Sequence, residues 1–343
     1  MRYSRFATNR RRFVAGAAGA LTLTSAMSPV RALAQATPAA TPAVPESPDM
    51  TGVSSSFQVG AFNCLSVSDG ANAAPGADAF LFMGGDPAAV QQALADAGID
   101  PSTFVLQHTS TVIDTGDDLV LVDTGSGPSG LPETGILIDN LRREGIQPTE
   151  VSVVVLTHGH PDHIGGNLTA SGNPLYSNAR YVMAQEEWDF WSDPAAVEAL
   201  IPDADTRQRN LDAFEANLAP LEGSIELIGF DEEIVPGVTS VASQGHTPGH
   251  MALLVESEGD MLWVLGDAAL HPLHVTYPEF TASFDTDPER TTETRQMLFD
   301  RIATEGGTAT FNHFDPFPSL GEIAAEGDTW MWQPVEMAGE ESE

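Results

Sequence analysis

The chain has 343 residues, of which 42% are hydrophobic, which is enough for one large core or two fused halves. All 14 basic residues are arginine, and six of them lie in the first 34 residues, which contain no acid. The rest of the chain carries 8 arginines against 49 acidic residues, a net charge of −41. So acidic a chain argues against nucleic-acid binding and anionic membranes, and its single cysteine, Cys64, excludes an internal disulfide.

Residues 1–34 are typical of an export signal. Arg10, Arg11 and Arg12 precede a weakly apolar run, and an A-x-A cleavage pattern ends at Ala34. The arginines resemble a twin-arginine signal, with an ordinary secretory signal as the alternative. We therefore expect a protein exported to the periplasm or beyond, with no integral membrane span once the signal is removed. Residues 35–55, rich in Pro, Ala and Thr, predict a disordered linker, and residues 331–343 an acidic tail.

Between these segments, residues 56–330 show alternating strand and helix patterns. The first strand is expected within 56–70, ending in a turn at Asp69 and Gly70. Further strands are predicted in 110–125 (a pair), 151–160, the first part of 179–191, 223–243 (a pair), 250–270 (a hairpin) and 308–318. Helices are predicted at 86–98, 134–146, the second part of 179–191, 203–221 and 287–307. Paired strands alternating with helices indicate an α/β sandwich of two sheets with helices outside.

The stretch VVVLTHGHPDHIGG, residues 153–166, delivers a polar cluster at the end of a buried strand. His158 and His160 lie two apart and can converge on one metal ion. Asp162 and His163 follow one turn later and can reach a second ion. Imidazole and carboxylate are ligands that Zn²⁺ and similar ions prefer. Four ligands cannot complete two sites, so the cluster requires partners from elsewhere.

Three further candidates each follow a short apolar run. His246 lies in QGHTPGH, Asp267 in VLGDAAL and His313 in ATFNHFDPFP. Because strand ends meet at one edge of a sandwich, we expect these side chains to join the 158–163 cluster.

This order of motifs resembles the metallo-β-lactamase superfamily over roughly residues 56–325. The later stretches SFDTDPERTTETRQMLFDRIATEGG and GDAALHPLH resemble the secreted branch that includes methyl parathion hydrolase. The resemblance implies a four-layer αββα sandwich of two mixed sheets with outer helices. It also implies two divalent metal ions with the following roles. The first ion takes His158, His160 and His246, the second takes Asp162, His163 and His313, Asp267 bridges them, and Asp123 and His250 lie behind the ligands.

The chemistry implied is hydrolysis. A water held by two ions has its pKa lowered to about 7, and the bridging hydroxide would attack a carbonyl carbon or phosphorus. Asp162, with Asp267, would be catalytic by orienting the water or carrying its proton. Related diiron oxidoreductases tend to have an acid where this chain has His160, so zinc is favoured, with Mn, Co or Fe as alternatives. The expected partner is a small neutral ester, lactone or organophosphate triester.

Aromatic residues near the ligand motifs are candidates for an apolar substrate pocket. The candidates are Trp188, Trp191, His274, Phe280 and Phe311. The alternative is that at least half of the aromatic residues belong to the core, where large aromatics usually lie.

Other functions stay open from the sequence. One is a β-lactam or acyl-homoserine-lactone hydrolase, although the scarcity of cations disfavours a β-lactam carboxylate. Another is an iron-dependent persulfide dioxygenase-like oxidoreductase, and a third is a non-catalytic extracellular metal-binding or surface-binding protein. A homodimer is also left open.

Overall fold

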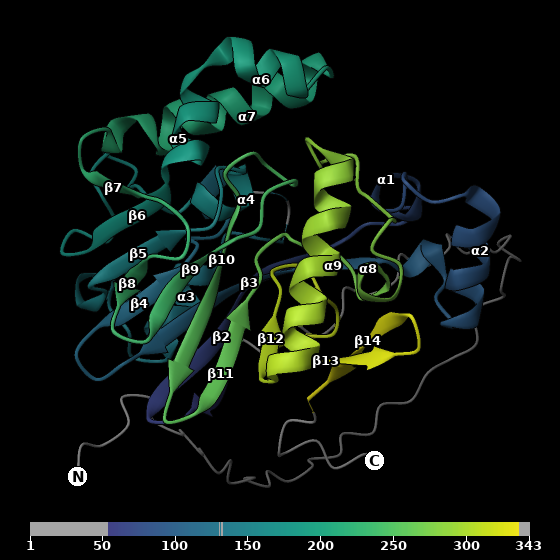
Figure 1. Cartoon of the computed structure of the whole chain (residues 1–343). Coiled ribbons are helices and arrows are strands. Elements are labelled where there is room, and N and C mark those ends of the chain that lie inside the picture. The colour runs from purple at the N-terminus through teal and green to yellow at the C-terminus, as the bar shows by residue number, and fades with distance from the viewer. Residues whose placement is uncertain (1–53, 130, 132, 336–343) are drawn as a thin grey trace, which may run out of the picture.

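A computed structural model describes residues 54–129, 131 and 133–335 (Figure 1). The expected export signal, nearly all of the expected linker and most of the expected acidic tail lie outside these ranges. Two seven-stranded mixed sheets pack face to face, and helices cover their outer surfaces. The predicted α/β sandwich with four layers is therefore confirmed.

The first sheet has its strands in chain order, antiparallel as far as β4 and parallel from β4 to β7. Its strands are β1 (Ser54–Val59), β2 (Phe62–Ala73), β3 (Val105–Asp114), β4 (Leu119–Val122), β5 (Val153–Leu156), β6 (Arg180–Ala184) and β7 (Ile225–Ile228). The second sheet runs in the order β14 to β8 and has one parallel pair, β11 with β12. Its strands are β8 (Glu233–Val235), β9 (Val238–Ala242), β10 (Met251–Ser257), β11 (Asp260–Val264), β12 (Thr308–Thr310), β13 (Leu320–Glu326) and β14 (Thr329–Pro334).

Helices surround this double sheet. They are α1 (Asp78–Leu81), α2 (Pro87–Asp96), α3 (Leu137–Arg143), α4 (Pro161–Ile164), α5 (Gln185–Ser192), α6 (Pro194–Leu200), α7 (Ala204–Asn217), α8 (Leu273–Thr276) and α9 (Pro288–Glu305). The predicted helices at 86–98, 134–146, 203–221 and 287–307 correspond to α2, α3, α7 and α9. Helix α9 begins as its sequence predicts, because the Asp287 side chain accepts from the Arg290 amide and Pro288 occupies the first turn.

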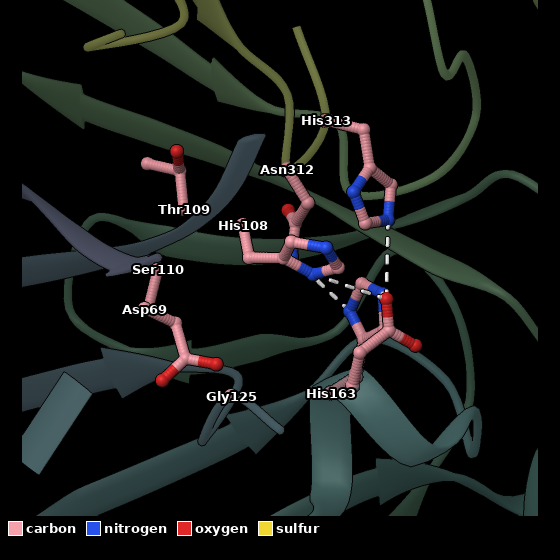
Figure 2. Close-up of a pocket in the computed structure, with 9 residues that line it drawn as sticks. Asp69, His108, Thr109, Ser110, Gly125, His163, Asn312 and His313 are labelled. Atoms are coloured by element: carbon pink, nitrogen blue, oxygen red, sulfur yellow. Dashed lines mark hydrogen bonds and ion pairs between the residues drawn. The ribbon is translucent and has the colours of Figure 1, made fainter. Parts of the chain in front are cut away.

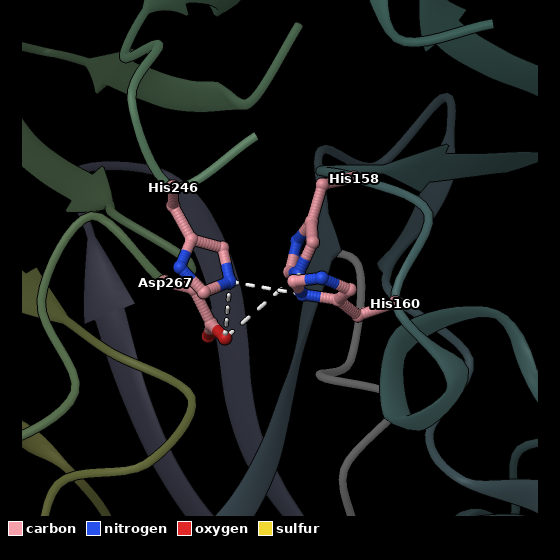
Figure 3. Close-up of side chains that lie close together, drawn as sticks. All are labelled: His158, His160, His246 and Asp267. Atoms are coloured by element: carbon pink, nitrogen blue, oxygen red, sulfur yellow. Dashed lines mark hydrogen bonds and ion pairs between the residues drawn. The ribbon is translucent and has the colours of Figure 1, made fainter. Parts of the chain in front are cut away.

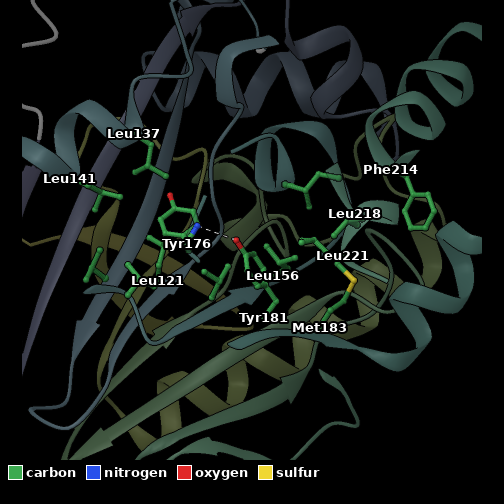
Figure 4. Close-up of a cluster of buried hydrophobic side chains, with 14 of the residues drawn as sticks. Leu121, Leu137, Leu141, Leu156, Tyr176, Tyr181, Met183, Phe214, Leu218 and Leu221 are labelled. Carbon is green, nitrogen blue, oxygen red and sulfur yellow. Dashed lines mark hydrogen bonds between the residues drawn. The ribbon is translucent and has the colours of Figure 1, made fainter. Parts of the chain in front are cut away.

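The core explains why β5 is apolar at every position. Val153 and Val155 lie in the cluster between the two sheets, whereas Val154 and Leu156 lie in the cluster under the outer helices. Figure 4 shows this outer cluster, to which α3 contributes Leu137 and α7 and its C-terminus contribute further side chains. A strand buried on both faces needs a continuous hydrophobic run, and such a strand holds its C-terminal end rigidly.

Several predicted boundaries were wrong. The first strand is a hairpin of β1 and β2, and Asp69 lies within β2 beside a register shift rather than in a turn. Ser54 and Ser55 pair with Val67 and Ser66, so β1 begins inside the expected linker.

Other differences concern how segments are divided between sheets. The segment 223–243 forms three strands, and β7 lies in the first sheet while β8 and β9 lie in the second. The hairpin of β13 and β14 was not predicted, and β14 extends to Pro334, past the expected domain end at 330. Within the described ranges, no helix is long and apolar enough to cross a membrane.

Candidate metal centre

The predicted polar cluster begins where β5 ends. His158 follows the strand, His160 precedes α4, and Asp162 and His163 lie within that single helical turn, which begins at Pro161. A tight packing of backbone supports the turn, because a Cβ at Gly165 would lie 2.1 Å from the Ser126 carbonyl oxygen. Only glycine permits this approach, so the local sequence places all four side chains at the end of the first sheet.

The second sheet supplies the remaining candidates. His246 follows β9, Asp267 follows β11 and His313 follows β12. Figure 3 shows the side chains of His246 and Asp267 pointing toward those of His158 and His160. The predicted meeting of distant strand ends at one edge of the sandwich is therefore observed.

The first group consists of His158, His160, His246 and Asp267. The His160 Nδ1 atom lies 3.0 Å from both the His158 Nε2 and the His246 Nε2 atoms. The Asp267 Oδ2 atom lies 3.4 Å from His246 Nε2 and 3.8 Å from His158 Nε2. All four residues are buried.

The second group consists of Asp162, His163, His313 and the same Asp267 oxygen. Figure 2 shows His163 and His313 of this group. Asp267 Oδ2 lies 3.4 Å from His163 Nε2 and 3.2 Å from His313 Nε2. Asp162 Oδ2 lies 3.7 Å and 3.4 Å from the same two nitrogens. One oxygen of Asp267 is thus shared by both groups.

These donor atoms fit a pair of divalent ions. Four ligands at zinc distances of about 2.0–2.1 Å in a tetrahedron lie roughly 3.3 Å apart. The observed separations within the groups, 3.0 to 3.8 Å, bracket that value. Moreover, His163 Nε2 and Asp267 Oδ1 are buried and have no hydrogen-bond partner among the described residues. Buried polar atoms without partners are costly, and coordinated cations would satisfy such a centre.

Protonation in the first group also suits metal binding. Burial lowers the pKa of His160 to about 3, and the neighbouring His246 adds to this effect. Burial, with His163 and His160, likewise lowers the pKa of His158 well below its usual value. Burial alone would raise the pKa of Asp267, but the adjacent His313 and His163 lower it. Two neutral imidazoles and an ionised carboxylate are therefore available as ligands at neutral pH.

Asp123 and His250 lie behind the ligands, where the sequence predicted them. Asp123 Oδ2 is 2.8 Å from His163 Nδ1, and its carboxylate also accepts from the amide and hydroxyl of Thr157. His250 Nε2 accepts from the Asp267 amide, so its Nδ1–H donates to Ser243 Oγ at 2.7 Å. Both side chains hold ligand segments in place.

Several neighbours of the centre were missed by sequence reasoning. His108 lies within β3, with Nδ1 3.4 Å from Asp162 Oδ2 and Nε2 2.7 Å from Asn72 Oδ1. The available signal was one histidine within a polar run of a strand, residues 107–111. Glu187 on α5 was also missed, as were Asp285 and Arg295, because acids and arginines on helices and loops are usually exposed.

The substrate-pocket prediction requires correction. His274, Phe280 and Phe311 are fully or nearly fully buried, and none of them lines the small cleft that opens on the centre. Phe311 stacks on Phe314 in the core under α9, and His274 Nε2 donates to the Leu81 carbonyl oxygen. Nearness to a candidate ligand in the sequence did not predict which face of its segment each side chain occupies. All three side chains lie on the core side.

The two tryptophans lie on the other side of the centre. Trp191 is buried with its ring edge-on to that of His160, and its indole N–H donates to Glu187. Trp188 is half-buried against Phe214. Neither tryptophan lines the small cleft that opens on the centre.

That cleft is small and is lined mainly by polar side chains (Figure 2). Its lining residues are Asp69, His108, Thr109, Ser110, Gly125, Asp162, His163, Asn312 and His313. It reaches the second ligand group, so a molecule in the cleft would meet that side of the centre first.

Comparison with known proteins agrees with this geometry. The family model of the metallo-beta-lactamase superfamily matches residues 103–304. An N-acyl homoserine lactonase of Bacillus sp is 28% identical over 43% of this chain and 57% of its own length. The N-acyl homoserine lactonase of Bacillus cereus is 28% identical over 45% of this chain and 60% of its own length. The chain thus spans less than two thirds of these relatives.

Solved structures show the same fold over most of the chain. The hydrolase AbOPH of the beta lactamase superfamily has a TM-score of 0.75 at 25% identity, covering 82% of this chain and 97% of its own. AidC, a dizinc quorum-quenching lactonase, has a TM-score of 0.74 at 20% identity over the same shares. These relatives support the prediction of a metal-dependent hydrolase. With more than half of its length matched by the family model, and with the ligand motifs converging in space, the chain belongs to the metallo-β-lactamase superfamily.

Proposed function

We propose that this protein is a dinuclear metal-dependent hydrolase that acts on a small neutral lactone or ester. One observation carries the proposal. Seven side chains from distant strand ends place their donor atoms 3.0 to 3.8 Å from their neighbours around one shared carboxylate oxygen. Zinc is the metal we propose, because the set is dominated by imidazole and its spacing suits tetrahedral coordination.

The ligand roles follow from the two groups. His158, His160 and His246 would hold one ion, Asp162, His163 and His313 the other, and Asp267 both. When bound, two such ions supply an activated water and polarise the oxygen of a carbonyl or phosphoryl group.

Asp162 has the largest exposed side-chain fraction among the proposed ligands. Its side chain is 26% exposed, against 4% for Asp267, and it lines the polar cleft. We therefore assign to its carboxylate the orientation of the attacking water and the acceptance of its proton. Asp123 and Asn312, which contact each other and His163, keep that imidazole oriented from behind.

Lactones are the substrate class that the relatives favour. Two curated relatives are N-acyl homoserine lactonases, although each is matched over only part of its length. The chain also has no lysine, and its described cleft contains no arginine, which suits an uncharged substrate better than a phosphate monoester or a β-lactam carboxylate. Acyl-homoserine lactones, which the sequence left as an alternative, thus join the simple lactones that were already expected.

A hydrolysis screen with measured metal content tests the proposal. Purified protein is offered N-acyl homoserine lactones, simple lactones, aryl esters, a phosphotriester and a β-lactam. We expect two divalent ions per chain, with turnover of lactones or esters. Asp267→Ala should abolish turnover and lower the metal content. Full activity in that variant, or one iron per chain with oxygen consumption, would contradict the proposal.

We also propose that the first 34 residues direct export by the twin-arginine route, on the basis of the arginine cluster. Replacing Arg10 and Arg11 by lysine should leave the protein in the cytoplasm, as measured by cell fractionation. Unchanged export would favour the ordinary secretory signal.

A further inference from the structure

A buried acid and a buried arginine lie directly behind His246. Asp285 Oδ1 is 2.9 Å from His246 Nδ1, and its other oxygen, Oδ2, accepts from the Ala282 amide at 2.7 Å. Arg295 Nη2 lies 3.6 Å from that second oxygen. The side chains of both Asp285 and Arg295 have an exposed fraction of 0%.

Arg295 projects from α9 and joins two segments that serve the metal centre. Its Nε donates to the Ala268 carbonyl oxygen at 2.7 Å, next to Asp267. Its Nη1 donates to the carbonyl oxygens of Phe280 at 2.7 Å and Pro278 at 3.2 Å, in the segment that leads to Asp285. The Arg295 guanidinium group therefore links the segment after Asp267 to the segment that carries Asp285, the hydrogen-bond partner of His246.

Packing alone does not account for this pair. Removing a charged arginine from water is costly, and an apolar side chain of similar volume would often stabilise a core equally well or better. The planar guanidinium group of Arg295 contacts three carbonyl oxygens and one carboxylate at once, a geometry that lysine cannot fully reproduce. Such an arrangement is typical of groups that hold metal ligands in position.

The geometry also selects one ring orientation for His246. Because Asp285 Oδ1 can only accept, His246 Nδ1 must carry the hydrogen, which leaves the Nε2 lone pair directed toward His160 and Asp267. Without the carboxylate, the imidazole could rotate or present the other nitrogen.

We propose that Asp285 and Arg295 are positioning residues, which lock His246 and the Asp267 segment for the first metal ion. This inference rests on the proposed metal centre. It gives a role to the FDTDPERTTETR stretch, which supplies Asp285, the Asp287 cap of α9 and Arg295 within a short length of chain.

The test uses the full-length mature protein loaded with Co²⁺, whose visible absorption reports ligand geometry. The variants are Asp285→Asn, Arg295→Met and Arg295→Lys. Matched controls are Asp287→Asn, which preserves a helix cap two residues away, and Arg301→Lys, a more exposed arginine on the same helix. Affinity for the first ion is measured by competition with a chelator, alongside kcat and KM of the metal-saturated enzymes.

We expect Asp285→Asn to lower the affinity for the first ion by about 10-fold to 100-fold and to change the absorption spectrum of bound Co²⁺. Arg295→Met should do the same to a smaller extent, with partial rescue in Arg295→Lys. At saturating metal, kcat should fall while KM changes little. The two controls should match the wild type.

The outcomes separate the two proposals. If the wild type binds no divalent metal, the proposed function fails. If the wild type binds two ions and Asp285→Asn shows wild-type affinity and spectrum, the positioning role is wrong while the function stands. Should Arg295→Met fail to fold, Asp285→Asn decides, because it leaves all three contacts between Arg295 and carbonyl oxygens intact.

Discussion

The two ligand groups share Asp267 but differ in their surroundings. His160 and His246 contact α5 and the segment before α9 through Trp191 and Asp285, and His158, His160 and His246 do not line the polar cleft. The second group instead opens through Asp162 on a polar cleft that His108 and Asn312 also line. For the proposed dinuclear centre, this comparison predicts that the substrate meets the ion of the second group first.

Glu187 illustrates the rigidity of the first group. Its carboxylate accepts four hydrogen bonds, from the Gly159 amide, Trp191 Nε1, the Thr247 hydroxyl and the Gly249 amide. It thereby ties the loop between His158 and His160 to the loop that follows His246. Beside the second group, the Asp123 carboxylate also accepts four hydrogen bonds, from the amide and hydroxyl of Thr157, from His163 Nδ1 and from Asn312 Nδ2.

Removal of metal from both groups should have the largest effect on activity and stability. Chelation should abolish hydrolysis and lower the free energy of unfolding by about 3 kcal/mol or more, because ligand binding stabilises the native state by mass action. Urea unfolding with and without added metal measures the change. The Asp267→Ala variant is the control, since its stability should respond less to the chelator. Identical unfolding curves for the wild type would disprove a contribution of metal to the fold.

Substituting one ligand from each group separates the two sites. His160→Ala and His313→Ala should each leave about one ion per chain and lose at least 10²-fold in kcat/KM. His160→Ala should also unfold more readily, by about 1–2 kcal/mol, because His160 Nδ1 lies 3.0 Å from ring nitrogens of both His158 and His246, which are buried. Metal analysis and thermal unfolding measure both effects. Equal stability of the two variants would contradict the larger contribution to stability that we expect from the first group.

Glu187→Gln tests how much the four hydrogen bonds to the Glu187 carboxylate stabilise the first group. The amide nitrogen would face two buried donors, so we expect a loss of about 2–3 kcal/mol in unfolding free energy and weaker binding of the first ion. Glu186→Gln, at the exposed neighbouring position, is the control. If both variants behave alike in urea unfolding and chelator competition, the hydrogen bonds to Glu187 do not stabilise the first group.

The smallest effect is expected from His108→Leu. This change removes the side chain 3.4 Å from Asp162 without altering any proposed ligand. We expect kcat/KM to fall about tenfold, with the affinity of the first ion unchanged. Steady-state kinetics and the same chelator competition measure these two quantities. A lower affinity for the first ion would show that the two groups are not independent.

Much of the fold was predictable, because local patterns carried it. The apolar run of β5, the amphipathic period of α9 and its Asp287–Pro288 start specify structure within one segment. The three strands of 223–243 were not predictable in the same way. Their division between two sheets depends on pairing with β6 and β10, which lie outside the segment.

The site divides along the same line. The sequence by itself determined the candidate ligand types and their strand-end placement, because each follows from a short polar motif after an apolar run. The shared role of Asp267 was implied only by the resemblance to the superfamily. Only the tertiary structure decided that His108, Glu187, Asp285 and Arg295 surround the centre and that Phe280 and Phe311 do not. The physical reason is that these side chains acquire their roles from neighbours in other segments, and chain folding alone brings those neighbours within hydrogen-bonding distance.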